Sequence, residues 1–253
     1  MIILRIIVNG LIMACELAAV AGIAAFAFHY PFLFAAVTAG LSFLLGLRLE
    51  VARLRYELPF YFGGLIKRGT IVTALIGAFE ATFKGVLAGI AALFTFAGTN
   101  ADRLYWVAIL FAICVYLGAS LLRLLSIRAE ALPLRWGYFR LAPALGLLFS
   151  AGLALLSAAH LLPAVSVADI GWEIIFKVPT HPSIEQVSEL IFQIKQAFDD
   201  FIVTVLSVVL DEKLARIVGI LVSVNVLSGF VSALYASLIA AGVRRTEDAL
   251  LCA

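Results

Sequence analysis

Long apolar runs separated by short polar stretches extend along almost the whole chain. A helix needs about 20 apolar residues to cross the hydrocarbon core of a bilayer, and several runs here reach that length. The pattern therefore predicts an all-α integral membrane protein, folded as a single membrane domain over residues 1–253. The six expected spans are about 2–28, 31–47, 70–97, 104–127, 141–165 and 217–243.

The composition excludes a soluble fold. The chain is 64% hydrophobic and 13% charged, whereas a soluble domain is about half apolar and about a quarter charged. The net charge of +2 gives no reason to expect a nucleic-acid partner. Three cysteines without paired spacing predict no disulfide framework. The first apolar run is too long for a cleavable signal, so we expect it to stay as the first span.

Positive charge is concentrated on one side of the predicted bundle. Of the 18 Lys and Arg residues, most lie near the termini or in connections on the same side as the termini. Short cytoplasmic segments are enriched in such residues, so we predict an inner (plasma) membrane location with both termini cytoplasmic. The basic connection 48–69 contains Arg48, Arg53 and Arg55, which we expect to contact anionic lipid or a cytoplasmic partner. An interfacial helix that only fixes the orientation is the alternative.

The long connection 166–216 is predicted to lie outside the cell membrane. Ser183 followed by Gln186 is typical of a helix N-terminus with a capping box. Apolar side chains then recur at helical spacing, at Ile184, Val187, Leu190, Ile191, Ile194 and Phe198. The segment predicts an amphipathic helix on the outer surface, in contact with lipid or with another membrane or periplasmic protein. A seventh span over 188–210 is the alternative, but it would bury two aspartates.

Two segments near the starts of the first and third spans resemble each other. Residues 7–16 and 71–80 are identical at six of ten positions, including the closing Glu16 and Glu80. Fainter matches elsewhere suggest that the spans repeat as pairs. The predicted hairpins cover about 1–64, 65–140 and 141–253.

Glu16, Glu80 and Lys84 are charged residues inside predicted spans. A helix rises 1.5 Å per residue, so both glutamates lie about 15 to 20 Å from the cytoplasmic end. A charge there costs about 2.5 to 3.5 kcal/mol on insertion scales, so it needs a compensating role. The three residues are predicted to line a polar path, or Glu80 and Lys84 form a structural pair on one helix face. A third interpretation has a protonated Glu16 bonded to Asn9, Asn225 or Ser150.

No sequence pattern points to an enzyme. The Walker loop, the nucleophile elbow and the His-Glu-x-x-His motif are absent, so we predict no catalytic residue and no cofactor. His29, His160 and His181 lie on the predicted outer side with Asp102 and Asp169. Imidazole and carboxylate suit zinc or copper, but no spacing supports such a site, and no metal is predicted.

These observations lead to one functional hypothesis and two alternatives. The first is a membrane-embedded transport component, such as a permease or channel subunit, that acts within a larger complex through Glu16, Glu80 and Lys84. The second is a non-catalytic structural or assembly subunit of a membrane machine. The third, an intramembrane enzyme, requires the outer histidines to bind a metal. The sequence itself names no substrate.

Overall fold

The computed structural model describes residues 2–62, 71–159, 161, 183–211, 214–215, 218–219 and 223–251. These residues form helices and no strands, and six segments among them are long and apolar enough to cross a membrane. The predicted class, an all-α protein with six candidate spans, is therefore confirmed. The spans are Asn9–His29, Pro31–Leu58, Ile71–Phe96, Ala101–Ala129, Pro133–Ser157 and Val224–Ala249.

The first half of the chain supplies four long helices. They are α1 (Ile2–His29), α2 (Pro31–Phe62), α3 (Ile71–Phe96) and α4 (Ala101–Ala129). Proline suits the first position of a helix, where its missing N–H would have no partner, so Pro31 lets α2 begin directly after Tyr30. The Asn100 side chain caps α4 by accepting a hydrogen bond from the Arg103 N–H.

The second half is less regular. Its described segments are α5 (Pro133–Trp136), η1 (Gly137–Leu141), α6 (Ala142–Ala158), α8 (Ile184–Ser207), η3 (Val224–Leu227) and α10 (Ser228–Leu251). The π-helical segment η1 joins α5 and α6 into one span. α8 is not among the six candidate spans, so the described residues do not support the seven-span alternative.

Two predicted boundaries differ from the structure. The second span was expected to end at residue 47, but α2 continues to Phe62 because its charged residues find partners on neighbouring helices. The fifth candidate span begins at Pro133 rather than at 141, and the side chains of Arg135 and Arg140 within it are exposed. The described part of the last candidate span begins at Val224; the predicted start at about 217 lies among residues that are mostly outside the described ranges and stays a prediction.

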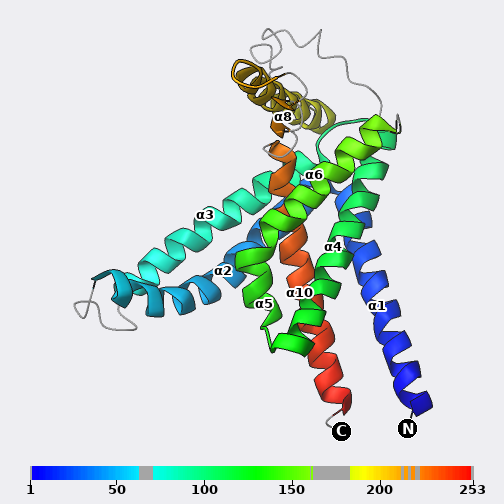
Figure 1. Cartoon of the computed structure of the whole chain (residues 1–253), viewed down its shortest axis with the longest axis vertical. Coiled ribbons are helices and arrows are strands. Elements are labelled where there is room, and N and C mark those ends of the chain that lie inside the picture. The colour runs from blue at the N-terminus through cyan, green and yellow to red at the C-terminus, as the bar shows by residue number, and fades with distance from the viewer. Residues whose placement is uncertain are drawn as a thin grey trace.

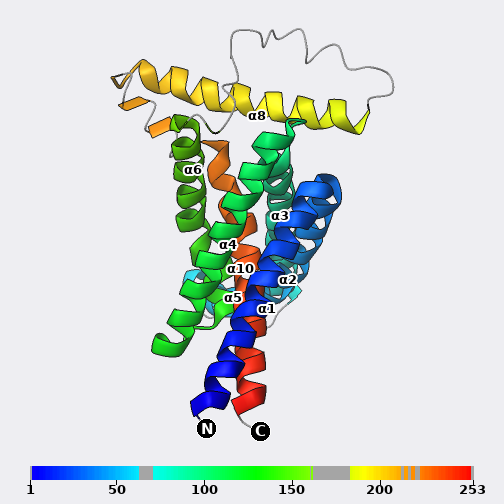
Figure 2. The same cartoon turned by 90° about the vertical axis from the view of Figure 1, so that its right-hand side faces the viewer.

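The helices form a bundle around α10. This helix packs against α4, α6 and η1, and α1 lies along α4 (Figure 1). Both chain termini lie at one end of the bundle, and α8 crosses the opposite end with its axis transverse to the spans (Figure 2). This arrangement is compatible with the predicted location of both termini on the same side of a membrane. That this side is the cytoplasm stays a prediction.

The most extensive helix pairing joins α2 to α3, not the members of the first or second predicted hairpin. Small residues permit this close approach. A Cβ atom on Gly85 would lie 3.1 Å from the Ala39 carbonyl oxygen, and one on Gly89 would lie 3.0 Å from the Ala39 Cβ. Gly22 of α1, by contrast, has open space around it. The three-hairpin arrangement is therefore not confirmed.

An aromatic cluster forms the core near the end of the bundle that α8 crosses. Phe34 is fully buried, and its ring centroid lies 5.4 Å from that of Phe96 and 5.9 Å from that of Phe111. The Tyr235 ring stacks on Phe34, and its hydroxyl lies 2.9 Å from the Thr38 hydroxyl oxygen. These residues come from α2, α3, α4 and α10. The cluster therefore closes the centre of the bundle on that side.

Candidate functional site

Five charged side chains of α2 and α3 form one connected cluster. Glu50 is fully buried and binds two cations: Lys84 Nζ donates to its Oε1, and Arg53 Nη1 lies 3.0 Å from its Oε2. Arg53 also donates from Nη2 to Glu80 Oε2 at 2.7 Å, and its Nε lies 3.0 Å from Glu57 Oε2. We call these five residues the charge cluster.

Helix periodicity and close packing bring the charge cluster together. Glu50, Arg53 and Glu57 are three and four residues apart, so they share one face of α2, and Glu80 and Lys84 share one face of α3. A Cβ atom on Gly77 would lie 2.6 Å from the Val51 Cγ2, so the two backbones are in close contact here. Short bridges between the helices are possible only because of this approach.

Aromatic rings of η1 cover the cations. Lys84 Nζ lies 5.1 Å from the ring centroid of Tyr138 and 4.9 Å from that of Phe139, and Arg53 Cζ lies 5.4 Å from the Phe139 centroid. These distances are within the range of cation–π attraction. Two consecutive residues rarely reach the same partner from a regular α-helix. The wider π turn of η1 accompanies the shared contact of Tyr138 and Phe139 with Lys84, and such turns are frequent at functional sites.

The charge cluster holds an excess of negative charge. With all five side chains ionised, Glu50, Glu57 and Glu80 oppose only Arg53 and Lys84. Uptake of one proton or one monovalent cation would neutralise the set. The side chains of Arg53, Glu80 and Lys84 are 29–31% exposed, so the cluster is reachable from the surface of the isolated chain. The arrangement is thus chemically able to bind and release a small cation.

The cluster also has a direction along the bundle. Glu57 lies next to the end of the second candidate span, whereas Lys84 is near the middle of α3. Charges alternate in sign along Glu57, Arg53, Glu50 and Lys84. A ladder of polar groups therefore runs inward from the connection between α2 and α3.

Glu16 does not join the cluster, although the sequence grouped it with Glu80 and Lys84. It is buried on α1, where Arg123 of α4 and Glu247 of α10 interact with it electrostatically, and these two residues form an ion pair. The proposed partner Asn225 instead donates to Ser223 and Asp199 at the opposite end of the bundle. The two glutamates of the apparent repeat thus face different arginines in different helix contacts.

The three arginines expected to meet lipid or a partner divide into two groups. Arg53 lies within the charge cluster and forms three ion pairs. Arg48 and Arg55 are exposed on α2. The sequence missed Glu50, Tyr138 and Phe139. The spacing of Glu50, Arg53 and Glu57 could have revealed their common face on α2.

α8 is attached to the bundle mainly through polar contacts. Ser188 Oγ accepts a hydrogen bond from the Gly98 N–H at 3.0 Å, and Lys195 Nζ donates to the Phe94 carbonyl at 3.1 Å. Asp199 accepts from the Val224 N–H at 2.8 Å. The lysine thus meets the carbonyl end of α3 and the aspartate meets the N–H end of η3, where each charge is favoured.

Lys195 is almost completely buried in this contact. Burial, together with nearby Arg103, lowers the pKa of its ammonium group to about 7, although Asp199 acts in the opposite direction. The capping box at Ser183 and Gln186 that the sequence predicted is present. The helix that follows it is therefore confirmed as a helix, and its position outside a membrane stays a prediction.

The apolar stripe expected to contact lipid or a partner on α8 is exposed at its two ends and half-buried between them. Ile184 is 73% exposed and Phe198 is 55% exposed, whereas Leu190, Ile191 and Ile194 are half-buried. The helix instead buries Ser188, Phe192 and Lys195. Ile184 and Phe198 thus remain accessible on the isolated chain.

No three His, Cys, Asp or Glu side chains that could hold a metal ion lie together in the described ranges. His160, His181 and Asp169, on which the alternative of a metal site depended, lie outside these ranges. Comparison of the chain with protein-family models, curated proteins and solved structures found no match.

Proposed function

We propose that the protein is a membrane-embedded transport component that uses the charge cluster to bind a proton or a small cation. The observation that carries this proposal is the buried carboxylate Glu50 within a set of three acidic and two basic side chains. Ionisable residues inside spans are costly, and those that persist commonly mark ion or substrate pathways. A purely structural pair would need only one residue of each sign.

The cluster supplies the elements of a coupled binding site. Glu50 forms ion pairs with both Arg53 and Lys84, and Arg53 forms ion pairs with both Glu50 and Glu80. A proton that binds one of the two carboxylates paired with Arg53 would weaken that ion pair. Arg53 would then bind its other carboxylate more strongly. The aromatic rings of η1 hold Lys84 in place while its partner changes. Proton binding would thereby alter the attraction between α2 and α3.

Access to the charge cluster from only one end of the bundle is compatible with an alternating-access mechanism. The polar ladder begins near Glu57, and the aromatic cluster around Phe34 blocks the centre of the bundle on the α8 side. α2 and α3 contact each other more extensively than either contacts the remaining helices, which favours their movement as a pair. We place the termini, and hence the entrance, on the cytoplasmic side of an inner membrane because the neighbouring segments are basic.

Proton flux into liposomes tests this function. The purified chain is reconstituted with a pH-sensitive dye inside the vesicles, and an inward pH gradient with a compensating potassium current drives the flux. The expected result is a flux that falls at least tenfold in Glu50→Gln, because the exchangeable proton is lost. Glu185→Gln on exposed α8 is the matched control and is expected to retain the flux.

A flux that persists in a folded Glu50→Gln variant would overturn the proposal. Circular dichroism and gel filtration verify that the variant is folded and monodisperse. Wild-type vesicles that carry no flux above protein-free vesicles would also contradict it, provided that the same preparation moves no monovalent cation.

A structural or assembly subunit is the second candidate. The exposed apolar stripe of α8 favours it, because a soluble or membrane partner could cover Ile184 and Phe198. This candidate predicts defined partners in native mass spectrometry of the protein purified in mild detergent from its own host. Those partners should remain bound in Glu50→Gln and be lost in Ile184→Ser/Phe198→Ser.

A further inference from the structure

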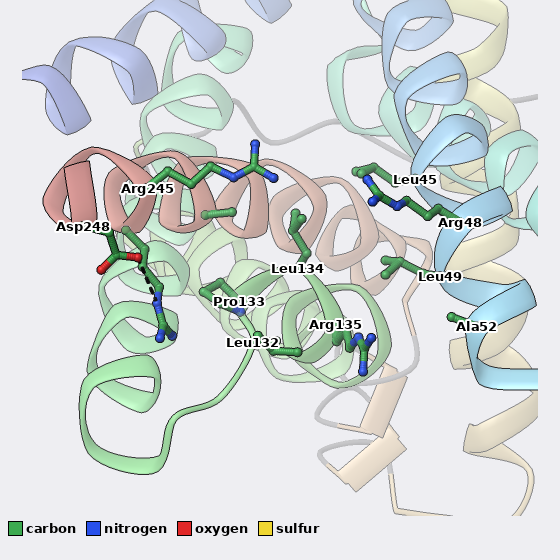
Figure 3. A pocket seen from close by; sticks show the side chains of 12 residues that line it. Leu45, Arg48, Leu49, Ala52, Leu132, Pro133, Leu134, Arg135, Arg245 and Asp248 are labelled. Atoms are coloured by element: carbon green, nitrogen blue, oxygen red, sulfur yellow. Dashed lines mark ion pairs between the residues drawn. The ribbon is translucent and has the colours of Figure 1, made fainter. Parts of the chain in front are cut away.

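A pocket lies between α2, α5 and α10 at the end of the bundle that carries both termini (Figure 3). Its volume is about 410 Å³, and three segments far apart in the sequence contribute to its walls. None of the charge-cluster residues lines it. The pocket is therefore distinct from the site proposed above.

The pocket walls carry more positive than negative charge. Arg48 of α2, Arg135 of α5 and Arg245 of α10 line it, and their side chains are exposed. Arg48 and Arg245 extend from their helices toward the space between α2 and α10 (Figure 3). None of the three forms an ion pair with an acidic residue in the part of the chain that the structure describes. Their charges are thus available to a ligand.

A fourth arginine is held in position by the protein. Arg244 Nη1 donates to the Ser126 hydroxyl and lies 3.3 Å from the Ala131 carbonyl oxygen. Its Nε lies 3.9 Å from Asp248, the one acidic residue among the described residues that line the pocket. Four guanidinium groups against a single carboxylate favour an anionic ligand. The planar guanidinium group matches phosphate oxygens in particular, since it donates two parallel hydrogen bonds.

The remaining walls are apolar. The leucines that line it are Leu45 and Leu49 of α2, Leu132 just before α5, and Leu134 of α5. A free phosphate ion or a phosphorylated metabolite gains little from leucine contacts. Acyl chains, in contrast, pack against leucine side chains without burying a polar group. The combination therefore favours a ligand that has both a phosphate group and hydrocarbon chains.

We propose that this pocket binds an anionic phospholipid, with its phosphate diester between Arg48, Arg135 and Arg245 and its acyl chains along the leucines. Arg135 and Arg245 lie about one turn from the ends of their candidate spans, which is the depth of lipid head groups. Basic pockets between transmembrane helices commonly bind such head groups. A lipid there would join α2 to the α5–α10 side of the bundle.

Native mass spectrometry of the full-length protein in detergent tests this site. Phosphatidylglycerol is titrated into the delipidated protein, and the bound fraction is compared with that for zwitterionic phosphatidylcholine. We expect phosphatidylglycerol to bind at least tenfold more tightly. Arg48→Gln/Arg245→Gln should weaken its binding at least tenfold, whereas Arg55→Gln, an exposed arginine of α2 outside the pocket, should leave it unchanged.

Further arms keep the test decisive. Arg135→Gln changes one exposed side chain, so it replaces the double variant if gel filtration shows that the latter is misfolded; a threefold loss of binding is then expected. Equal affinity for the two lipids, or an equal loss in Arg55→Gln, would refute a defined site. Displacement of bound phosphatidylglycerol by millimolar inorganic phosphate would also overturn the proposal and assign the pocket to a water-soluble phosphate compound.

Discussion

Loss of the Lys84 ammonium group should leave a buried carboxylate without its main partner. Glu50 is fully buried, and Lys84 and Arg53 are the two cations that contact it. Breaking a buried ion pair by removal of one partner destabilises a protein by about 3 to 5 kcal/mol. Because Arg53 still lies 3.0 Å from Glu50, we expect Lys84→Met to lower the free energy of unfolding by about 3 kcal/mol, near the lower end of this range.

A second substitution, Glu50→Gln, separates the effect of the unpaired charge from the effect of lost packing. Glu50→Gln removes the negative charge, so adding it to Lys84→Met should recover most of the lost stability. Reversible unfolding in mixed micelles at increasing denaturant measures the free energy of unfolding for the four members of the double-mutant cycle. Arg55→Gln serves as a control for a basic residue on α2 that has no ion pair among the described residues.

Two outcomes would contradict this reasoning. If Lys84→Met changes the unfolding free energy by less than about 0.5 kcal/mol, the pair does not stabilise the fold. If the effects of the two substitutions add to within about 0.5 kcal/mol, the residues are not coupled and the contact has no energetic weight.

Three further predictions concern other parts of the molecule. The pKa of Lys195 is about 7 in the folded protein, against an ordinary value of 10.5 that applies to the unfolded chain. Between pH 7 and 10.5 the unfolded chain therefore binds a proton at Lys195 that the folded protein has released. Stability should therefore rise from pH 7 to 10 by up to about 1.4 kcal/mol per unit, and thermal melting should show a flatter profile in Lys195→Met. Gly85→Val places a Cβ 3.1 Å from Phe43 Cβ and should destabilise the fold by about 1 to 3 kcal/mol in denaturant unfolding, whereas Gly22→Val meets open space and should have little effect. A reporter that is active only in the cytoplasm should be active when it is fused after residue 129 and when it is fused at the C-terminus. Activity at one of these two points but not at the other would refute the proposed topology.

Parts of the candidate site were accessible from periodicity alone. Glu80 and Lys84 are four residues apart, which places them on one helix face whatever the fold. Their partners are not accessible in this way, because Glu50 and Lys84 are 34 residues apart and on different helices. The internal resemblance between 7–16 and 71–80 suggested a shared site for Glu16 and Glu80, but similar helices can pack against different neighbours. Glu16 accordingly interacts electrostatically with Arg123, whereas Glu80 forms an ion pair with Arg53.

The sequence by itself determined the helical membrane class, the six candidate spans and the capped helix that starts after Ser183, because each depends on local length, hydropathy and hydrogen bonding. Only the tertiary structure decided that α2 pairs with α3, that a π turn brings Tyr138 and Phe139 to the cations, and that α8 buries Lys195 against the end of α3. The physical reason is that all these helices are apolar on most faces. Hydropathy then marks which segments leave water but not which faces meet, and the small residues that select the partner act only through three-dimensional contact.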